Sequence, residues 1–221
     1  YLPVFLFFLN FAILAYFPAL GFPLTEPRNY FFANLLYMAV NFAVMLLIFR
    51  RTLWQSLREF EGKMLLSVLI GFGMCYGANL VLTTAYTVLD IMPENYNQEA
   101  VNSLLGGYPL AMTLCTVVLA PLAEECLFRG VLFAPLARRC LPAAYALSMF
   151  LFAGMHVFQF LGSMTAANTI LCLSLYLPAS FSLCWVYQKT GNIWAGIFLH
   201  MFINFQSVLA SLLRSLMQAF L

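Results

Sequence analysis

The chain carries very little charge. Of its 221 residues, 8% are Asp, Glu, Lys or Arg, whereas an ordinary soluble domain has about 25%. Hydrophobic residues make up 64% of the sequence, so the few charges are too sparse to cover a water-facing surface. The net charge of +2 is also too small to attract nucleic acid. We therefore expect an integral membrane protein whose surroundings are a lipid bilayer, with no nucleic-acid partner.

Several signatures of common enzyme classes are absent. The six cysteines show no C-x-x-C spacing, which favours small apolar packing residues over a metal or redox site. The sequence lacks the H-E-x-x-H helix of zinc proteases and the G-x-S-x-G elbow of serine hydrolases. Cys126 follows Glu125, and a neighbouring carboxylate disfavours the reactive thiolate. The two halves show no internal symmetry, which counts against a secondary transporter.

Long apolar runs occupy most of the chain. A helix needs about 20 apolar residues to cross the hydrocarbon of a bilayer. Seven segments meet this requirement: 3–23, 30–49, 64–88, 108–136, 141–160, 165–187 and 192–212. We predict an all-α, polytopic transmembrane bundle of about seven membrane helices, or eight if a further helix precedes Tyr1. Residues 1–221 are expected to form a single integral membrane domain, with close helix contact at Gly73 and Gly77, which match the small-xxx-small pattern.

Basic residues gather in alternate loops. Seven Lys and Arg residues lie in loops 50–63, 137–140 and 188–191, whereas the intervening loops hold Arg28 alone. The positive-inside rule places these three basic loops in the cytoplasm and loop 89–107, which can hold a short surface helix, on the other side. We expect a bacterial plasma membrane. Because loops 137–140 and 188–191 are short, we also expect any cavity to open to the cytoplasm or sideways to lipid.

A few polar residues interrupt the apolar segments. Ionisable groups at membrane depth are costly and usually mark a functional site. These residues are Glu124, Glu125, Arg129, His156, His200 and Asn204. With a rise of about 1.5 Å per residue from the basic loops, Glu124, His156 and His200 reach a similar depth near the middle of the bilayer. We therefore predict that three helices deliver these groups to one polar cavity.

The spacing around the two glutamates indicates different tasks for them. Glu125 and Arg129 are four residues apart, in the order that favours an ion pair on one helix face. Such a pair would stay ionised and fix the helix. Glu124 is rotated by about 100° from Glu125, so it can point toward the histidines. Pro121 donates no backbone hydrogen bond and loosens the helix just before them.

The histidine segments show the same kind of regularity. Phe152 precedes His156 by one helical turn and can form a wall beside it. His200 and Asn204 are four residues apart and share a face of their helix. These positions suggest that His156 and Glu124 act on one water, while His200 and Asn204 act together on a neighbouring atom.

This set of groups can hydrolyse an amide bond. Glu124 and His156 can hold and deprotonate a water molecule. Attack on a peptide carbonyl creates an oxyanion, to which His200 and Asn204 can donate hydrogen bonds. The predicted reaction is hydrolysis of a peptide bond within the membrane, without a covalent intermediate and without a cofactor.

Three alternatives use the same residues. Glu124, His156 and His200 can serve as ligands of a catalytic zinc ion, which keeps a fourth position open. The Glu125–Arg129 pair can simply lock two helices together, with His200 and Asn204 as interhelical contacts in a membrane protein that only binds. Intramembrane Glu and His residues can also relay protons in a proton-coupled transporter.

Three motifs resemble those of a known family. The sequence contains E-E-x-x-x-R at Glu124–Arg129, F-x-x-x-H at Phe152–His156 and H-x-x-x-N at His200–Asn204. In this order they resemble the CPBP family of intramembrane proteases, which is similar to type II CAAX prenyl endopeptidases and includes bacterial (Abi) members linked to bacteriocin immunity. The resemblance covers about residues 105–210, the expected protease core.

The resemblance implies roles for the motif residues. The first glutamate and the first histidine would activate water, and the second histidine and the asparagine would steady the oxyanion. Here these are Glu124, His156, His200 and Asn204, with Glu125, Arg129 and Phe152 in support. It implies an endopeptidase acting on a membrane-associated or lipidated peptide or protein. The family is often described as metalloproteases, whereas we favour a metal-free glutamate mechanism. The alternative function is a non-catalytic membrane immunity protein.

Overall fold

The computed structural model describes residues 2–220, without the side chains of residues 2–8, 10, 11 and 219. Within this part the chain folds into helices joined by short loops, with no strands. Within this part, six helical segments are long and apolar enough to cross a membrane: Pro27–Arg58, Gly62–Val88, Pro109–Ala137, Leu141–Ser163, Ala166–Thr190 and Ile193–Gln218. They confirm the all-α polytopic fold and coincide with six of the seven predicted spans. The predicted span 3–23 overlaps α1 (Leu2–Ala19), half of whose side chains lie outside the described residues, and it stays a prediction.

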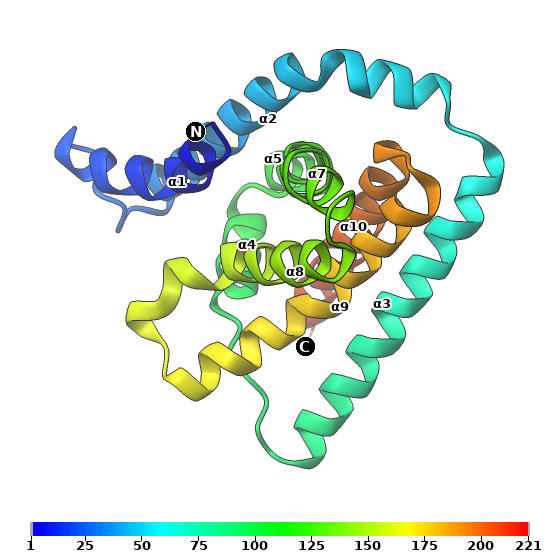
Figure 1. The fold of residues 1–221 in the computed structure, drawn as a ribbon. Coiled ribbons are helices and arrows are strands. Elements are labelled where there is room, and N and C mark those ends of the chain that lie inside the picture. Colours follow the sequence, from blue (N-terminus) through cyan, green and yellow to red (C-terminus); the bar gives the residue numbers. More distant parts are fainter. Residues whose placement is uncertain (1, 221) are drawn as a thin grey trace.

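Two long helices border the bundle. Helices α2 (Pro27–Arg58) and α3 (Gly62–Val88) run along its outside and meet at a short turn, and α1 packs beside α2 (Figure 1). Helix α3 packs against α9 and α10 on its inner side. Several large apolar side chains of α3 are exposed, among them Leu65, Leu66, Leu69, Leu80 and Val81. Apolar exposure of this extent is expected of a helix that faces lipid.

The close contact on α3 is made at Gly71. A Cβ atom at Gly71 would lie 2.5 Å from Val186 Cγ2 and 2.9 Å from Leu199 Cδ2. A Cβ at Gly73 or Gly77 would meet no heavy atom of the described chain within 4 Å. The predicted contact at Gly73 and Gly77 is therefore wrong, because these two glycines are turned away from α9 and α10.

The fourth predicted span is one continuous helix with two π-helical stretches. The Ala120 N–H donates to Cys115 O, five residues back, and the Ala134 N–H donates to Arg129 O in the same way. The 3.6-residue periodicity of the sequence does not reveal these wider turns, which occur frequently at functional sites. In order, the span comprises α5 (Pro109–Leu114), η1 (Cys115–Leu119), α6 (Ala120–Glu125), η2 (Cys126–Phe133) and α7 (Ala134–Ala137).

The last three helical segments pack around this span. Interior contacts join α8 to α9 and α10 to both α9 and α3 (Figure 1). A buried apolar cluster in this region includes Phe128, Phe152, Leu183, Val186 and Leu199. The segments are α8 (Leu141–Val157) continuing into η3 (Phe158–Ser163), α9 (Ala166–Thr190) and α10 (Ile193–Ala219).

Polar contacts tie α10 to α2 at the end of the bundle that carries the basic loops. Helix α9 ends at Gly191, which adopts φ +64°, and Asn192 caps α10 by accepting a 2.9 Å hydrogen bond from the Trp194 N–H. The Asn192 Nδ2 donates to Ser56 O at 2.6 Å, and the Ile193 N–H donates to Ser56 Oγ at 3.1 Å. These buried bonds fix the entry of α10, which carries His200 and Asn204.

The predicted surface helix in loop 89–107 is α4 (Tyr96–Gly107). The Asn95 side chain caps it by accepting a 3.0 Å hydrogen bond from the Gln98 N–H. On the side of α10, Ser207 Oγ donates to Gln98 Oε1 at 3.3 Å and Ser211 Oγ donates to Asn102 Oδ1 at 2.8 Å. Helix α4 is therefore held against α10 by polar side chains.

Candidate active site

A polar cavity lies inside the bundle. Its volume is about 180 Å³, and Glu124, His156 and Asn204 all line it. Three different helices thus bring these side chains to one place. His200 is not part of the lining and lies just behind Glu124, with its Nε2 atom 3.8 Å from Glu124 Oε2.

Glu124 is mostly buried but reaches the cavity. Its side chain is 19% exposed. Among the described residues, no group makes a hydrogen bond to its buried Oε2 atom. This atom faces His200, so the other carboxylate oxygen, Oε1, is the one that can accept a proton from a water or a substrate in the cavity.

His156 is oriented by its own helix. Its Nδ1 atom lies 2.9 Å from Phe152 O. Because a carbonyl oxygen only accepts, Nδ1 carries the proton, and Nε2 of the neutral ring keeps a free lone pair. The imidazole stacks on Tyr176, with 4.5 Å between the ring centroids and 21° between the planes. Sequence analysis missed Tyr176, because one tyrosine in an apolar helix carries no distinguishing signal.

Behind the cavity, Glu125 connects α6 to two other elements. Its Oε1 atom accepts a 3.0 Å hydrogen bond from Arg129 Nη1 and lies 2.8 Å from His200 Nδ1. The Arg129 Nη2 donates to Ser180 O at 3.1 Å. Glu125 and Arg129 are fully buried. The structure shows the predicted Glu125–Arg129 pair, whereas the bond to His200 joins separate helices and has no counterpart in the spacing of the sequence.

Gly196 and Phe152 shape this network. A Cβ atom at Gly196 would lie 3.0 Å from Glu125 Oε2, so glycine leaves the space that the carboxylate occupies. The Phe152 ring lies 4.9 Å from the His156 ring and 5.5 Å from the His200 ring, measured between centroids. The Arg129 guanidinium lies 5.0 Å from the same ring, within range of a cation–π interaction.

Asn204 binds a backbone carbonyl that a proline leaves without its usual N–H donor. Its Nδ2 donates to Thr116 O at 2.8 Å. In η1 the Ala120 N–H pairs with Cys115 O, so the next residue would pair with Thr116 O. That residue is Pro121, which has no N–H, and the Asn204 amide satisfies the carbonyl in its place. One further N–H of the amide remains for a ligand in the cavity.

The residues considered for zinc do not form a ligand set in this structure. Within residues 2–220, no three His, Cys, Asp or Glu side chains converge in an arrangement that can hold a metal ion. The Nδ1 atoms of His156 and His200 are engaged by Phe152 O and Glu125, and the Nε2 of His200 is 3.8 Å from Glu124. Histidines that bind metals commonly have their second ring nitrogen held in this way, so the Nε2 atoms are the ones that would face a metal ion.

Comparison with known proteins gives a family match for the part of the chain that carries the site. Residues 106–206 match the family model described as "Type II CAAX prenyl endopeptidase Rce1-like". The matched segment contains all three motifs and nearly coincides with the predicted core 105–210. This match confirms the resemblance to the CPBP family of membrane proteases.

A curated relative extends the similarity beyond the core. The chain is 27% identical over 186 residues to "Putative membrane peptidase YdiL" of Bacillus subtilis (strain 168). The aligned region covers 80% of this chain and 72% of the relative. No solved structure gives a significant match. Together the two matches support the class of integral membrane proteases.

Proposed function

We propose that the chain is an intramembrane endopeptidase that hydrolyses a peptide bond of a membrane-associated peptide or protein. The observation that carries the proposal is that Glu124, His156 and Asn204 line one cavity although they come from three helices. A carboxylate, an imidazole and an amide around one polar space are the groups that a water-activated amide hydrolysis needs.

In the proposed reaction, Glu124 acts as the general base. A water molecule donates one hydrogen bond to Glu124 Oε1 and a second to the Nε2 lone pair of His156. The water oxygen forms a bond to the carbonyl carbon, and its proton passes to Glu124. The remaining N–H of Asn204 donates to the developing oxyanion. When the C–N bond breaks, Glu124 returns the proton to the departing amine, which yields a carboxylate and an amine.

We assign His200 a positioning role toward Glu124. The motif resemblance assigns it to the oxyanion, but its Nε2 faces Glu124 Oε2 at 3.8 Å and its ring is not part of the cavity lining. Glu125 fixes the ring by binding Nδ1. In this orientation Nε2 stabilises the carboxylate when protonated and accepts from the carboxylic acid when neutral. His200 thus controls the protonation and direction of the proposed base.

The decisive variant is Glu124→Gln, which keeps the shape of the side chain and removes the base. Purified protein in lipid nanodiscs is incubated with a library of bacterial membrane proteins, and new N-termini are identified by mass spectrometry. We expect the cleavages of the unmodified protein to fall by about 10²–10⁴-fold in the variant.

Glu61→Gln serves as the matched control, because Glu61 is exposed and pairs with Lys63 far from the cavity. This control is expected to cleave at the normal rate. Undiminished cleavage by a folded Glu124→Gln protein would refute the mechanism. A binding or immunity protein without catalysis would produce no new N-termini in any of the three samples.

A further inference from the structure

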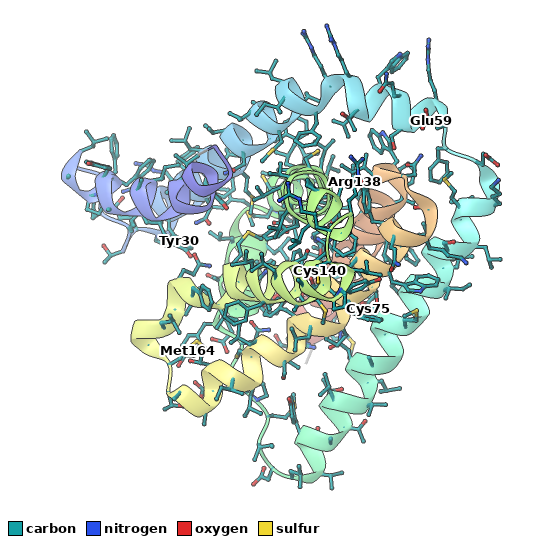
Figure 2. All side chains as sticks on the ribbon, in the orientation of Figure 1. Tyr30, Glu59, Cys75, Arg138, Cys140 and Met164 are labelled. Carbon is teal, nitrogen blue, oxygen red and sulfur yellow. The ribbon has the colours of Figure 1, made fainter. Side chains whose placement is uncertain are left out.

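The cavity lies in one half of the membrane-spanning region. On α2 its lining residues fall between Tyr30 and Met38, near the end that is remote from basic loop 50–63. On α10 they begin at Asn204, well past the basic α9–α10 turn. Figure 2 shows Tyr30 toward the left side of the molecule, and Glu59 and Arg138 of the basic end toward the upper right. Every lining residue lies at or beyond the level of Glu124 on the side of α4.

Packed apolar side chains separate the cavity from the basic loops. Glu125 and Arg129, directly behind Glu124, are fully buried. Beyond them lies the buried cluster that includes Phe128, Leu183 and Val186. A separate hollow of about 320 Å³ lies at the basic end, lined by Gly130, Arg138 and Gly191 among others, and it shares no lining residue with the cavity at Glu124. The cavity at Glu124 therefore does not extend to the basic loops, whereas the expected opening sideways to lipid stays a prediction.

The lining on the α4 side combines uncharged polar groups with apolar side chains such as Val101 and Leu104. Helix α4 contributes Asn97 and Gln98, α2 contributes Asn34, and α10 contributes Ser207. Among the described lining residues, Glu124 is the only carboxylate, and none is Lys or Arg. Amide and hydroxyl groups can exchange hydrogen bonds with a peptide backbone, and the apolar groups beside them can contact the side chains of the same peptide.

We infer that the peptide substrate reaches Glu124 from the non-cytoplasmic side, past α4. That the entering molecule is a substrate rests on the proposed function. The direction of access rests on the lining residues and on the positions of the basic loops. It assigns α4 to the mouth of the cavity. The cleaved bond would then lie in the outward half of the membrane.

Thiol labelling tests the direction without requiring catalysis. Ala100 on α4 and Ala120, one helical turn before Glu124, both line the cavity. The single variants Ala100→Cys and Ala120→Cys are small changes outside the proposed catalytic groups. Of the six native cysteines, all within the described residues, Cys140 alone is exposed, and it lies in basic loop 137–140. Cys140 therefore serves as an internal marker of the cytoplasmic side.

Intact cells and inverted membrane vesicles are treated with a membrane-impermeant maleimide, and labelled sites are mapped by mass spectrometry. We expect Ala100→Cys and Ala120→Cys to be labelled in intact cells, with Cys140 unlabelled there and labelled in inverted vesicles. Labelling of both cavity positions only in inverted vesicles, or in neither preparation, would overturn the inference. Because two positions are probed, poor folding of one variant leaves the other to decide.

A cleavage assay on the labelled protein separates the access route from the protease assignment. Labelling of Ala120→Cys from outside should abolish any cleavage activity. Outside labelling without cleavage by the unmodified protein would sink the protease assignment and retain the access route. Cleavage together with labelling from the cytoplasmic side alone would retain the protease assignment and refute the access route.

Discussion

Asn204 donates a 2.8 Å hydrogen bond to the carbonyl oxygen of Thr116, on the π-helical turn before the two glutamates. Thr116 O is free for this bond because Pro121, which would be its partner in the turn, has no N–H. The proline therefore acts on the site indirectly, by leaving a backbone acceptor that anchors the Asn204 amide beside the cavity.

Replacing this proline should harm activity without harming the fold. In Pro121→Ala the new N–H can pair with Thr116 O and displace Asn204. We expect cleavage to slow by about 10-fold or more, since a poorly held oxyanion donor costs up to about 2.7–4 kcal/mol of transition-state stabilisation. Thermal unfolding should be unchanged or shifted upward. Full activity together with normal stability would show that Asn204 does not depend on Pro121.

Gly196 supplies the space for the Glu125 carboxylate. In Gly196→Ala the new Cβ would lie 3.0 Å from Glu125 Oε2, so the carboxylate must shift and its bond to His200 must lengthen. We expect kcat to fall severalfold while KM changes little. Gly73→Ala is the matched control, because a Cβ there meets nothing within 4 Å and alanine gains about 0.5–1 kcal/mol in a helix. Equal effects of the two variants on kcat would contradict this role for Gly196.

Breaking the buried ion pair should cost more than breaking an exposed one. Arg129→Met leaves the fully buried Glu125 without its cation, and we expect a loss of about 3–5 kcal/mol in the free energy of unfolding. Glu125→Gln combined with Arg129→Met should recover part of that loss. Lys63→Met breaks the exposed Lys63–Glu61 pair and should cost about 0–1 kcal/mol. Denaturation in a defined detergent measures all three, and similar losses for both single variants would refute the buried-pair argument.

Metal dependence is open to a direct measurement. The mechanism proposed for Glu124 and His156 predicts that chelators leave the cleavage rate unchanged. It also predicts that purified active protein contains far less than one metal ion per chain by elemental analysis. Loss of cleavage after chelation, restored by zinc and by no other addition, would instead favour a rearranged site with Glu124, His156 and His200 as ligands.

Much of the helical framework was predictable because each membrane span must satisfy its backbone internally and present apolar side chains to lipid. The span around Glu124 was located to within a residue at each end, 108–136 against Pro109–Ala137. The Glu125–Arg129 pair was predictable for a similar reason, since both residues lie on one helix. Local rules of spacing were sufficient there.

Contacts between helices were not predictable in the same way. The bond from His200 to Glu125 and the stacking of Tyr176 on His156 depend on how separate helices are rotated. The pattern at Gly73 and Gly77 suggested a close contact, yet Gly71 makes it, because the rotation of α3 is set by packing against α9 and α10.

The π-helical stretch Cys126–Phe133 directly follows the paired glutamates and includes Arg129. A π turn accommodates a surplus residue relative to an α turn of equal height, which makes this stretch sensitive to chain length. Removing one residue between 130 and 133 would let the segment rewind as an α-helix with α7 near its present orientation, whereas removing a second residue would turn α7 by about 100°. The register of this span is thereby a constraint separate from its composition, and a deletion that touches no polar side chain can still misalign α7 and the basic loop after it.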